Sequence, residues 1–260
     1  MSRYRHPDTT ALVLAAGQGT RMKSDLAKVL HPMAGRPLLA HMLSTLEDLG
    51  VGCVLVVIGH QRERVRETFA TAPVEWVIQA EQRGTGHAVL MAVPTLEGFA
   101  GTLLLVCGDT PLLQARTLDA LLIGHERSGA AVTVLSMRLP DPTGYGRIIR
   151  GGGDAITGIV EHRDATPDQR AIDEVNSGVF AFQYPKLAKA LAGLTAHNTQ
   201  GEYYITDTVT LLQRAGEKTA VVCAPDAREL LGINTVEQLA EAERVFESLR
   251  QGADPAGGRS

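Results

Sequence analysis

The sequence predicts an α/β fold with a doubly wound, mostly parallel but mixed sheet. Short runs of valine, isoleucine and leucine alternate with helical patterns through the first 140 residues, and several of these runs are nearly continuous. Strands of a parallel sheet have this composition when helices cover both faces. Strands that alternate with helices are joined by right-handed crossovers, which place the helices on the two sides of the sheet.

The elements of the first half follow from this alternation. The apolar runs are expected to be strands, namely Ala11–Ala16, Cys53–Ile58, Glu75–Gln79, Thr102–Cys107 and Ala131–Met137. The stretches between them are expected to contain the helices Pro37–Leu49, Arg62–Ala70, Gly86–Val93 and Ala115–Ser128. Ligands of such sheets bind beyond the carboxyl ends of the strands, where Gly17, Gln79 and the pair Gly108-Asp109 are expected to gather.

The pattern changes after residue 140. Arg147–Ile149 and Ile156–Glu161 flank a glycine-rich turn, Gly151–Asp154, and together predict a hairpin. Further strands are expected at Val175–Gln183 and Ala220–Ala224, and further helices at Pro185–Ala192, Thr206–Ala215 and Thr235–Gln251. The last helix has a narrow apolar stripe, Leu239, Ala242, Phe246 and Leu249. Docking on the core is the preferred interpretation of this stripe, and a helix–helix contact in a homo-oligomer is the alternative.

The composition limits the class of protein. A chain of 260 residues, 44% of them apolar, can form one large or two small domains. A net charge of −4, with scattered basic residues, indicates no nucleic-acid partner, and no apolar stretch approaches the length of a membrane span. Cys53, Cys107 and Cys223 lie far apart and are interpreted as buried thiols in a reducing compartment. Because Met1–Thr10 has no apolar targeting core, the expected location is the cytoplasm.

The loop after the first predicted strand is the most informative segment. Gly17 and Gly19 have no Cβ and let backbone N–H groups approach a ligand closely. Arg21 offers phosphate oxygens a planar fork, and Lys28 offers a mobile point charge. Neither a Walker A loop nor the dinucleotide fingerprint fits, because Met22 stands where each requires glycine. Taken alone, the loop is also consistent with a tight strand-to-helix turn that carries solvated cations.

Two other strand ends carry polar residues. Asp109 follows the predicted strand Thr102–Cys107, and Mg²⁺ prefers one or two carboxylates together with phosphate oxygens. In isolation, an aspartate that caps the turn before a helix is equally consistent. Gln79 opens the string Gln-Ala-Glu-Gln-Arg-Gly-Thr-Gly-His, whose amide and glycine backbone offer the paired donors and acceptors that a nucleobase edge requires. This string alone is also consistent with an ordinary loop and helix start.

Amides and carboxylates next to glycines gather in the second half of the chain. They occur in Tyr145-Gly146-Arg147, Glu161-His162, Asn176-Ser177-Gly178 and Gly201-Glu-Tyr-Tyr-Ile-Thr-Asp207. Such groups suit a sugar with many hydroxyls, although each string is a weak signal by itself. The histidines have no metal-ligand spacing, and neither a nucleophile elbow nor a Cys–His signature is present.

Read together, these strings identify a family resemblance. In order, the chain contains Leu14-Ala-Ala-Gly-Gln-Gly-Thr-Arg-Met, Ser24-Asp-Leu-Ala-Lys-Val-Leu-His, the Gln79 string, Asp141-Pro-Thr-Gly-Tyr-Gly-Arg, Gly158-Ile-Val-Glu-His and the Gly201 string. Over roughly residues 10–250 they closely resemble the uridylyltransferase half of the bacterial bifunctional N-acetylglucosamine-1-phosphate uridylyltransferase/glucosamine-1-phosphate acetyltransferase. The first loop alone indicates sugar-nucleotide pyrophosphorylases in general, whereas the Gln79 and Gly201 strings are much more specific.

The resemblance implies a Rossmann-like nucleotide-diphospho-sugar transferase fold and a reaction. UTP and N-acetylglucosamine 1-phosphate would give UDP-N-acetylglucosamine and pyrophosphate by direct in-line attack, with Mg²⁺ as cofactor. By the same resemblance Arg21, Lys28 and Asp109 are catalytic, and Asp109 and Asn234 hold the metal. The implied substrate-binding residues are Leu14, Ala15, Ala16, Gly17, Lys28, Gln79, Gly84, Thr85, Cys107, Gly108, Gly146, Glu161, Asn176, Tyr204, Thr206 and Asn234.

The resemblance also divides the chain. A nucleotidyltransferase domain is expected over residues 1–234, with a nucleotide-binding part at about 10–140 and a sugar-binding part at about 141–234. A C-terminal helix (235–251) and a disordered tail (252–260) follow. The family's second half, a β-helix of hexapeptide repeats, has no counterpart here, so uridylyl transfer without acetyl transfer is expected. Ala27 replaces the family's usual proline and Ser177 its usual threonine, and neither change removes a predicted role.

Two alternatives stay open. A sister nucleotidyltransferase would use another sugar 1-phosphate or another base, and the amide-rich second half favours an N-acetylated sugar. A non-catalytic sugar-nucleotide-binding protein is disfavoured because Arg21, Lys28, Asp109 and Asn234 are all present. A NAD-binding oxidoreductase lacks support, since the third glycine and the ribose-binding acid are missing.

Overall fold

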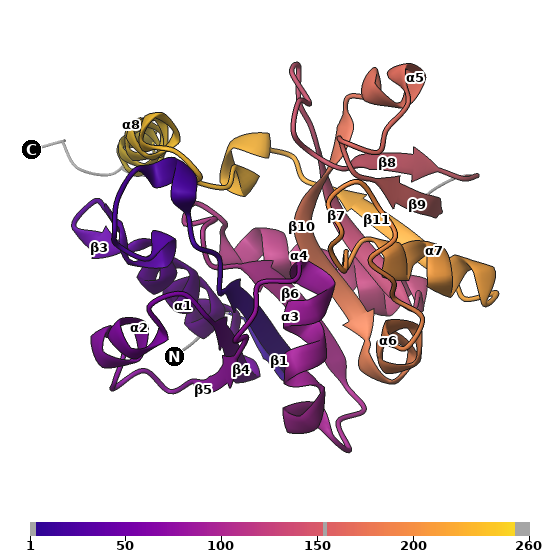
Figure 1. The fold of residues 1–260 in the computed structure, drawn as a ribbon, viewed down its shortest axis with the longest axis horizontal. Helices are drawn as coiled ribbons and strands as arrows, with labels where there is room; N and C mark the ends of the chain where they lie inside the picture. The colour runs from indigo at the N-terminus through magenta and orange to yellow at the C-terminus, as the bar shows by residue number, and fades with distance from the viewer. Residues whose placement is uncertain (1–3, 153–154, 253–260) are drawn as a thin grey trace, which may run out of the picture.

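A large mixed sheet forms the centre of the molecule. Its strands are β1 (His6–Ala15), β4 (Val51–Ile58), β5 (Glu75–Ile78), β6 (Thr102–Cys107), β7 (Val132–Arg138), β8 (Arg147–Arg150), β9 (Ile156–Val160), β10 (Glu174–Gln183) and β11 (Thr219–Cys223). In the computed structural model, which describes residues 4–152 and 155–252, the order across the sheet is β11-β7-β10-β6-β1-β4-β5. The β8–β9 hairpin is attached through β10 (Figure 1).

The sheet is mostly parallel, as predicted. β1 pairs in parallel with β4 on one side and with β6 on the other. β10 alone among the main-path strands of the described chain runs antiparallel to both of its neighbours, β6 and β7. The chain runs from β1 to β4 and β5 on one side and then returns to β6 on the other side of β1. In sheets of this kind, ligands bind in the crevice at such a reversal of strand order, and here the carboxyl ends of β1 and β6 border it.

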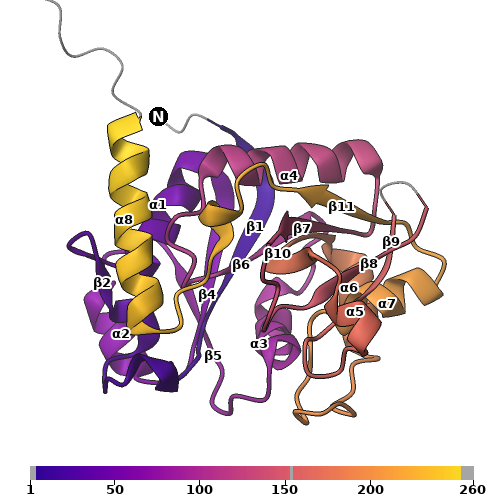
Figure 2. The same ribbon diagram turned by 90° about the horizontal axis from the view of Figure 1, so that it is seen from above.

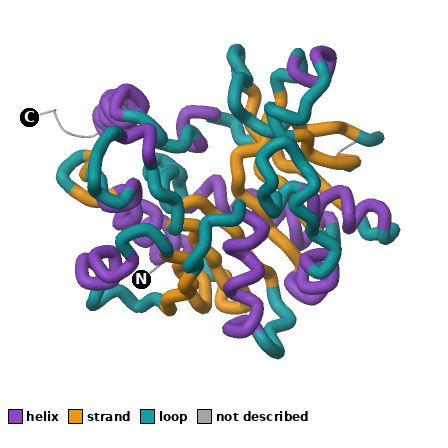
Figure 3. Tube along the Cα trace, viewed as in Figure 1, coloured by secondary structure: helices purple, strands orange, loops and turns teal. Residues whose placement is uncertain are grey.

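Helices cover both faces of the sheet. They are α1 (Leu38–Leu49), α2 (Arg62–Thr68), α3 (Thr85–Ala92), α4 (Ala115–Ser128), α5 (Pro167–Arg170), α6 (Tyr184–Leu191), α7 (Asp207–Arg214) and α8 (Val236–Gly252). Apolar residues of α1, α2 and α4 share one core cluster, and those of α3, α6 and α7 share another. Successive side chains of β1 point to opposite faces of the sheet. Leu12 belongs to the cluster with α3, α6 and α7, and Val13 belongs to the cluster with α1, α2 and α4. Figure 2 shows the strands between α4 on one side and α3 on the other, and Figure 3 shows helices around the central strands.

Every predicted strand and helix has a counterpart, with two kinds of difference. β1 begins at His6 rather than at Ala11, because its polar first half already pairs with β4 at Val51 and with β6 at Thr102. Elements too short for a hydrophobic period were not predicted. These are α5, β2 (Pro32–Met33), β3 (Arg36–Pro37) and the 3₁₀ turns η1 (Thr20–Met22), η2 (Lys28–Leu30), η3 (Val93–Leu96) and η4 (Ala227–Leu230).

Two predicted segments lie partly outside the described residues. Residues 153–154 of the predicted turn and 253–260 of the predicted tail are not described, whereas residue 252 belongs to α8. The division into a nucleotide part and a sugar part stays a prediction. The sheet itself continues through both, because β10 lies between β6 and β7.

The C-terminal helix docks on the molecule through its predicted stripe. Ala242 and Val245 are buried, and Leu239 and Phe246 pack against the same cluster. The other buried members of this cluster come from the segment between β1 and α1, from the first residue of α1, from the loop after β6 and from the segment before α8, namely Met22, Met33, Leu38, Leu112 and Ile233. Figure 2 shows α8 running alongside the first half of the fold. The preferred interpretation of the stripe is therefore confirmed for these residues, while the side chain of Leu249 is not described.

The cysteines correct one expectation. Cys53 and Cys107 are half-buried and Cys223 is exposed, so the interpretation of all three as buried thiols was wrong. Cys223 is the last residue of β11, which forms an edge of the sheet and therefore has a neighbouring strand on one side only. All three are free thiols. Within residues 4–152 and 155–252, no helix combines the length and the apolar character that a membrane crossing needs.

Candidate active site

The loop after β1 folds back over the carboxyl ends of β1 and β6. The N–H of Gly108 donates to the carbonyl of Leu14 at 2.9 Å, which joins the ends of the two strands. Gly19 has a φ of 68°, and a Cβ there would lie 2.7 Å from the Cβ of Lys28. Glycine is thus required for the loop to pass close to Lys28, and the 3₁₀ turns η1 and η2 then carry Arg21 and Lys28.

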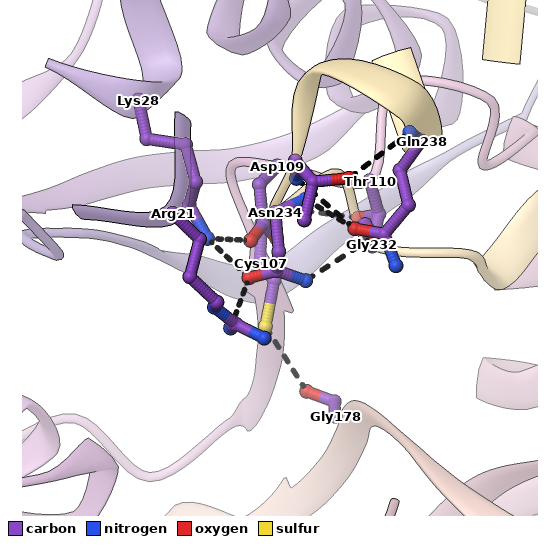
Figure 4. A network of polar contacts seen from close by, with 10 residues as sticks. Arg21, Lys28, Cys107, Asp109, Thr110, Gly178, Gly232, Asn234 and Gln238 are labelled. Atoms are coloured by element: carbon purple, nitrogen blue, oxygen red, sulfur yellow. Dashed lines mark hydrogen bonds and ion pairs between the residues drawn. The ribbon is translucent and has the colours of Figure 1, made fainter. Parts of the chain in front are cut away.

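Four of the predicted site residues meet in one polar network (Figure 4). The ammonium of Lys28 pairs with the carboxylate of Asp109 and donates to Oδ1 of Asn234 at 3.1 Å. Nη2 of Arg21 donates to the same amide oxygen at 2.9 Å. The side chains of Lys28 and Asp109 are 15% and 16% exposed, so this ion pair is largely withdrawn from water. Segments that are far apart in the sequence therefore converge on one point.

Backbone contacts fasten the segment that carries Asn234 to the end of β6. Ile233 is buried, and its N–H donates to the carbonyl of Asp109 at 2.9 Å. The side-chain amide of Asn234 donates to the carbonyl of Gly232 at 3.3 Å, and its backbone N–H donates to Oε1 of Gln238 at 2.7 Å. The amide oxygen of Asn234 is thereby held on the side of Asp109.

The pair Asp109 and Asn234 fits a magnesium ion by its donor chemistry. Both residues offer an oxygen to the same ammonium of Lys28, so a carboxylate oxygen and an amide oxygen converge. Mg²⁺ prefers oxygen ligands and commonly takes only one or two from the protein, with phosphate oxygens and water completing the shell. In the described part of the chain, no group of three or more His, Cys, Asp or Glu residues could hold a metal ion. A two-residue site completed by a phosphate-bearing substrate therefore suits this molecule better than an all-protein cage.

A pocket of about 270 Å³ opens beside this network and is called the central pocket below. It is lined by Leu14, Ala15, Ala16, Gly17, Lys28, Val29, Gln79, Gln82, Gly84, Thr85, Ala88, Cys107, Asp109 and Glu202. The predicted nucleotide-binding residues from the loop after β1 and from the Gln79 string are thus brought together. The end of β6 adds Cys107 and Asp109 to the same wall.

Gln79 is buried in the wall of the central pocket and is held there by hydrogen bonds. It is 3% exposed, and its N–H donates to the carbonyl of Ile58 at 2.8 Å. Its side-chain amide nitrogen donates to the carbonyl of Gly84 at 3.1 Å and lies 3.1 Å from Nδ1 of His87. Gly84 has a φ of 103°, and a Cβ there would lie 2.6 Å from the carbonyl oxygen of Tyr203. Both the positive φ and the close approach of Tyr203 therefore require glycine at position 84.

A second group of predicted residues comes together between β8, β9 and β10. The N–H of Asn176 donates to the carbonyl of Gly146 at 2.8 Å, and the hydroxyl of Thr206 donates to Oε1 of Glu161 at 3.0 Å. A Cβ at Gly146 would lie 3.3 Å from that same oxygen. Burial raises the pKa of Glu161, against the lowering effect of the Thr206 hydrogen bond. Tyr204, two residues before Thr206, is also buried, and its hydroxyl accepts a hydrogen bond from the side-chain amide of Gln200 at 2.7 Å.

This second group lies outside the central pocket but is joined to it. The thiol of Cys107 is 3.9 Å from the carbonyl of Gly178, whose N–H donates to Oδ1 of Asn176 at 3.0 Å. At a second point, the N–H of Ile205 donates to the hydroxyl of Thr85 at 3.1 Å. The predicted residues that do not line the central pocket are Arg21, Gly108, Gly146, Glu161, Asn176, Tyr204, Thr206 and Asn234.

Four lining residues and one supporting residue were not predicted from the sequence. Gln82 and Glu202 lie inside the Gln79 and Gly201 strings, so those strings contained a signal for them. Val29 and Ala88 are apolar and carry no such signal. Gln238 supports Asn234, and its spacing from Thr235 matches a capping box, Thr-x-x-Gln, which could have identified it.

The thiol beside the ion pair is not a nucleophile. Burial, with a further contribution from the charge of Asp109, raises the pKa of Cys107 to about 12. Burial and the charge of Asp109 also raise the pKa of Tyr145. Both groups therefore stay protonated at neutral pH, and the thiolate that nucleophilic catalysis would need is not available.

Comparison with known proteins shows which family this chain resembles. A family model described as the MobA-like NTP transferase domain matches residues 11–164. The bifunctional protein GlmU of Thermobifida fusca is 50% identical over 241 residues, which cover 90% of this chain and 50% of the relative. The GlmU of Streptomyces griseus is 51% identical over 239 residues, with the same two coverages. The chain thus spans about half the length of the curated relatives it matches.

One solved structure carries the same fold. A crystal structure of UDP-glucose pyrophosphorylase complexed with UDP-glucose matches with a TM-score of 0.75 at 17% identity. The match covers 93% of this chain and 99% of that one. At this identity the likeness bears on the fold alone, and it confirms the Rossmann-like arrangement of the predicted family.

Proposed function

The chain belongs to the MobA-like NTP transferase family, and from that membership and the site geometry we propose that it is a uridylyltransferase. It would convert UTP and N-acetylglucosamine 1-phosphate into UDP-N-acetylglucosamine and pyrophosphate. The single observation that carries the proposal is the meeting of Arg21, Lys28, Asp109 and Asn234 beside the central pocket. The names and the half-length match of the GlmU relatives support the same reaction.

The central pocket would hold the nucleotide. The backbone of Leu14–Gly17 and the fixed loop from Gln79 to Gly84 offer donors and acceptors to uracil and ribose. The side-chain nitrogen of Gln79 already contacts Gly84 and His87. The side-chain oxygen of Gln79, Oε1, is therefore the atom that would accept from the uracil N3–H. Thr85 and Cys107 complete the wall on which the ribose would rest.

The group around Gly146 would hold the sugar phosphate. Glu161 and Asn176 present a carboxylate and an amide that can bond sugar hydroxyls and the acetamido group. A Cβ at Gly146 would lie 3.3 Å from Oε1 of Glu161, so glycine leaves this carboxylate oxygen uncrowded. Tyr204 and Thr206 buttress this region, and Thr206 orients the Glu161 carboxylate directly.

The chemistry is one substitution at the α-phosphorus of UTP. A phosphate oxygen of the sugar 1-phosphate forms the new bond, and the bond from the α-phosphorus to the bridging oxygen breaks, so the pair of electrons leaves with pyrophosphate. Arg21 and Lys28 neutralise the charge that moves onto the leaving group. Mg²⁺, held by Asp109 and Asn234, would act as a Lewis acid toward the phosphate oxygens. The chain contributes mainly position and charge, since no protein nucleophile is required.

One assay tests the proposal. Pyrophosphate release is measured with a panel of four nucleoside triphosphates and several sugar 1-phosphates, with and without Mg²⁺. We expect turnover only with Mg²⁺ and fastest with UTP and N-acetylglucosamine 1-phosphate. Activity with UTP and glucose 1-phosphate alone would overturn the sugar assignment. No activity with any pair would favour a protein that binds sugar nucleotides without turning them over.

The cytoplasm is the proposed location, because UTP and sugar phosphates are metabolites of that compartment. Fractionation of cells that express the native protein tests this. Association of copies through α8 stays an untested prediction, and the stripe that suggested it is engaged within the chain.

A further inference from the structure

Asn234 lies in the short segment between η4 and α8, outside any helix or strand. Among the described residues, its side chain forms hydrogen bonds with the tips of two long cationic side chains, Lys28 and Arg21, and with the carbonyl of Gly232. Long cationic side chains have many rotamers, so they do not by themselves fix the residue to which they donate. The direction of the Asn234 side chain must instead be set by its backbone.

Gln238 supplies the anchor for that backbone. Oε1 of Gln238 accepts from the N–H of Asn234 at 2.7 Å and from the N–H of Thr235 at 3.2 Å. The N–H of Gln238 in turn donates to the hydroxyl of Thr235 at 3.2 Å. Figure 4 shows Gln238 reaching from α8 to the network around Asn234 and Asp109.

This arrangement extends a common helix start. In a capping box, the side chain of the third helical residue accepts from the N–H of the capping residue alone. Here the same oxygen also accepts from the preceding residue, and that second bond is the shorter one. Two N–H groups that converge on one acceptor restrict the rotation of the peptide before Asn234. On the other side, Ile233 is fixed to the carbonyl of Asp109.

We infer that Gln238 is a positioning residue, which aims the amide oxygen of Asn234 at Asp109 and so shapes the metal site. The inference rests on the proposed function, because it takes Asn234 as a ligand of the divalent ion. Residues that orient metal ligands typically change metal affinity or activity by about 10- to 100-fold when they are replaced. The helix-capping part of the arrangement has no such link to the metal.

Three substitutions separate positioning from helix capping. Gln238→Met keeps the length of the side chain and removes the acceptor. Thr235→Ala removes the hydroxyl of the capping box and leaves both bonds from Gln238 to the backbone N–H groups. Gln238→Glu keeps an accepting oxygen and serves as the conservative rescue. Binding of Mn²⁺ to each protein with UTP present is followed by water-proton relaxation enhancement, and thermal unfolding is recorded alongside.

We expect Gln238→Met to weaken Mn²⁺ binding about tenfold, while Thr235→Ala and Gln238→Glu stay within about twofold of the wild type. The thermal midpoints of Gln238→Met and Thr235→Ala should be lowered similarly, since both lose bonds at the helix start. Equal Mn²⁺ affinity in Gln238→Met and Thr235→Ala would overturn the inference and leave the proposed function standing. Absence of Mn²⁺ binding by the wild type would overturn both the inference and the metal site on which it rests.

Discussion

Lys28 and Asp109 join the loop after β1 to the end of β6, and the contact between them is mostly withdrawn from water. We predict that Lys28→Ala or Asp109→Ala lowers turnover about a hundredfold, or about 3 kcal/mol of transition-state stabilisation, as for other single electrostatic groups. The fold should stay intact, because neither residue belongs to an apolar cluster. Pyrophosphate release and circular dichroism of the purified variants check both parts.

Lys23→Ala is the matched control, because this exposed lysine of the same loop is outside the Arg21–Lys28–Asp109–Asn234 network. It should keep nearly full turnover. Wild-type rates in Lys28→Ala or Asp109→Ala would refute the catalytic assignments.

Gly84 is the residue on which the shape of the loop from Gln79 to Gly84 depends. In Gly84→Ala, the new Cβ would meet the carbonyl of Tyr203 at 2.6 Å in a backbone region that alanine rarely adopts. Such strain costs about 1–3 kcal/mol, so we predict a KM for UTP raised roughly tenfold or more, as the loop that holds Gln79 shifts. Gly98→Ala is the control, since its φ is also positive, at 76°, with nothing within 4 Å of the added Cβ. Equal KM values in the two variants would show that the collision is unimportant.

Single residues of the site were predictable to different degrees. Arg21, Lys28 and Asp109 could be proposed from the residues themselves, because charged residues and glycines that follow buried strands of an α/β sheet indicate a ligand site. Asn234 was implied by the family resemblance alone, since an amide in a short turn carries no chemical signal of its own. The lining residues Val29 and Ala88 could not be found, because an apolar side chain against a ligand looks like any other core residue in the sequence.

At the scale of elements, α4 and β7 contact each other through a buried histidine. His125 is 4% exposed and its Nδ1 lies 2.9 Å from the hydroxyl of Thr133. Burial lowers the pKa of His125 from its ordinary 6.5 to about 4, so the folded protein keeps the ring neutral. The unfolded chain takes up a proton below pH 6.5 and the folded chain does not, so stability present at pH 7 is lost as the pH falls toward 4. This loss amounts to at most about 3 kcal/mol.

Urea unfolding of the wild type and of His125→Gln, at pH 7 and at pH 4, measures this contribution. We predict a smaller fall in the free energy of unfolding for the variant over the same interval, because its side chain does not titrate. Other groups titrate in both proteins and cancel in the comparison. Parallel pH dependences would contradict the assignment of a neutral, buried His125.

Helix α8 and three segments of the site share one small apolar cluster. Met22 follows Arg21, Leu112 lies three residues after Asp109, and Ile233 precedes Asn234. Ala242→Asp would bury a charge among these side chains, and we predict a loss of about 2 kcal/mol or more in the free energy of unfolding. Turnover at a temperature where the variant is folded should fall as well. Ala240→Asp on the exposed side of the same helix should change neither quantity appreciably, and equal effects of the two variants would contradict this account.

The sequence was informative about elements with a strong hydrophobic pattern and uninformative about their pairing. The predicted runs contain the strands because buried parallel strands need continuous apolar residues. The start of β1 was missed because His6, Thr9 and Thr10 pair with neighbouring strands through backbone groups, which leave no trace in side-chain hydrophobicity. The docking of α8 followed from its stripe, but the residues that receive it come from four separate segments.

At the scale of the whole molecule, the position of β10 decides how the two groups of site residues meet. β10 lies antiparallel between β6 and β7, which puts Gly178 beside Cys107 at the edge of the central pocket. Local sequence patterns do not specify which strands become neighbours when more than 70 residues separate them. The two groups of site residues could therefore be predicted as two sets, and the contact between the two sets could not.

This arrangement predicts the stereochemistry of the reaction. Two potential nucleophiles line the central pocket, a thiol whose pKa is raised to about 12 and an aspartate already paired with Lys28, and neither is prepared to attack phosphorus. For the proposed substrates, held at adjoining sites, we predict transfer in one displacement with inversion of the configuration at the α-phosphorus. Turnover of a single diastereomer of the α-thio analogue of UTP, with ³¹P NMR of the product, measures this outcome. A covalent uridylyl-enzyme would instead give retention through two displacements. It would also exchange labelled pyrophosphate into UTP without any sugar phosphate, and such exchange would refute direct transfer.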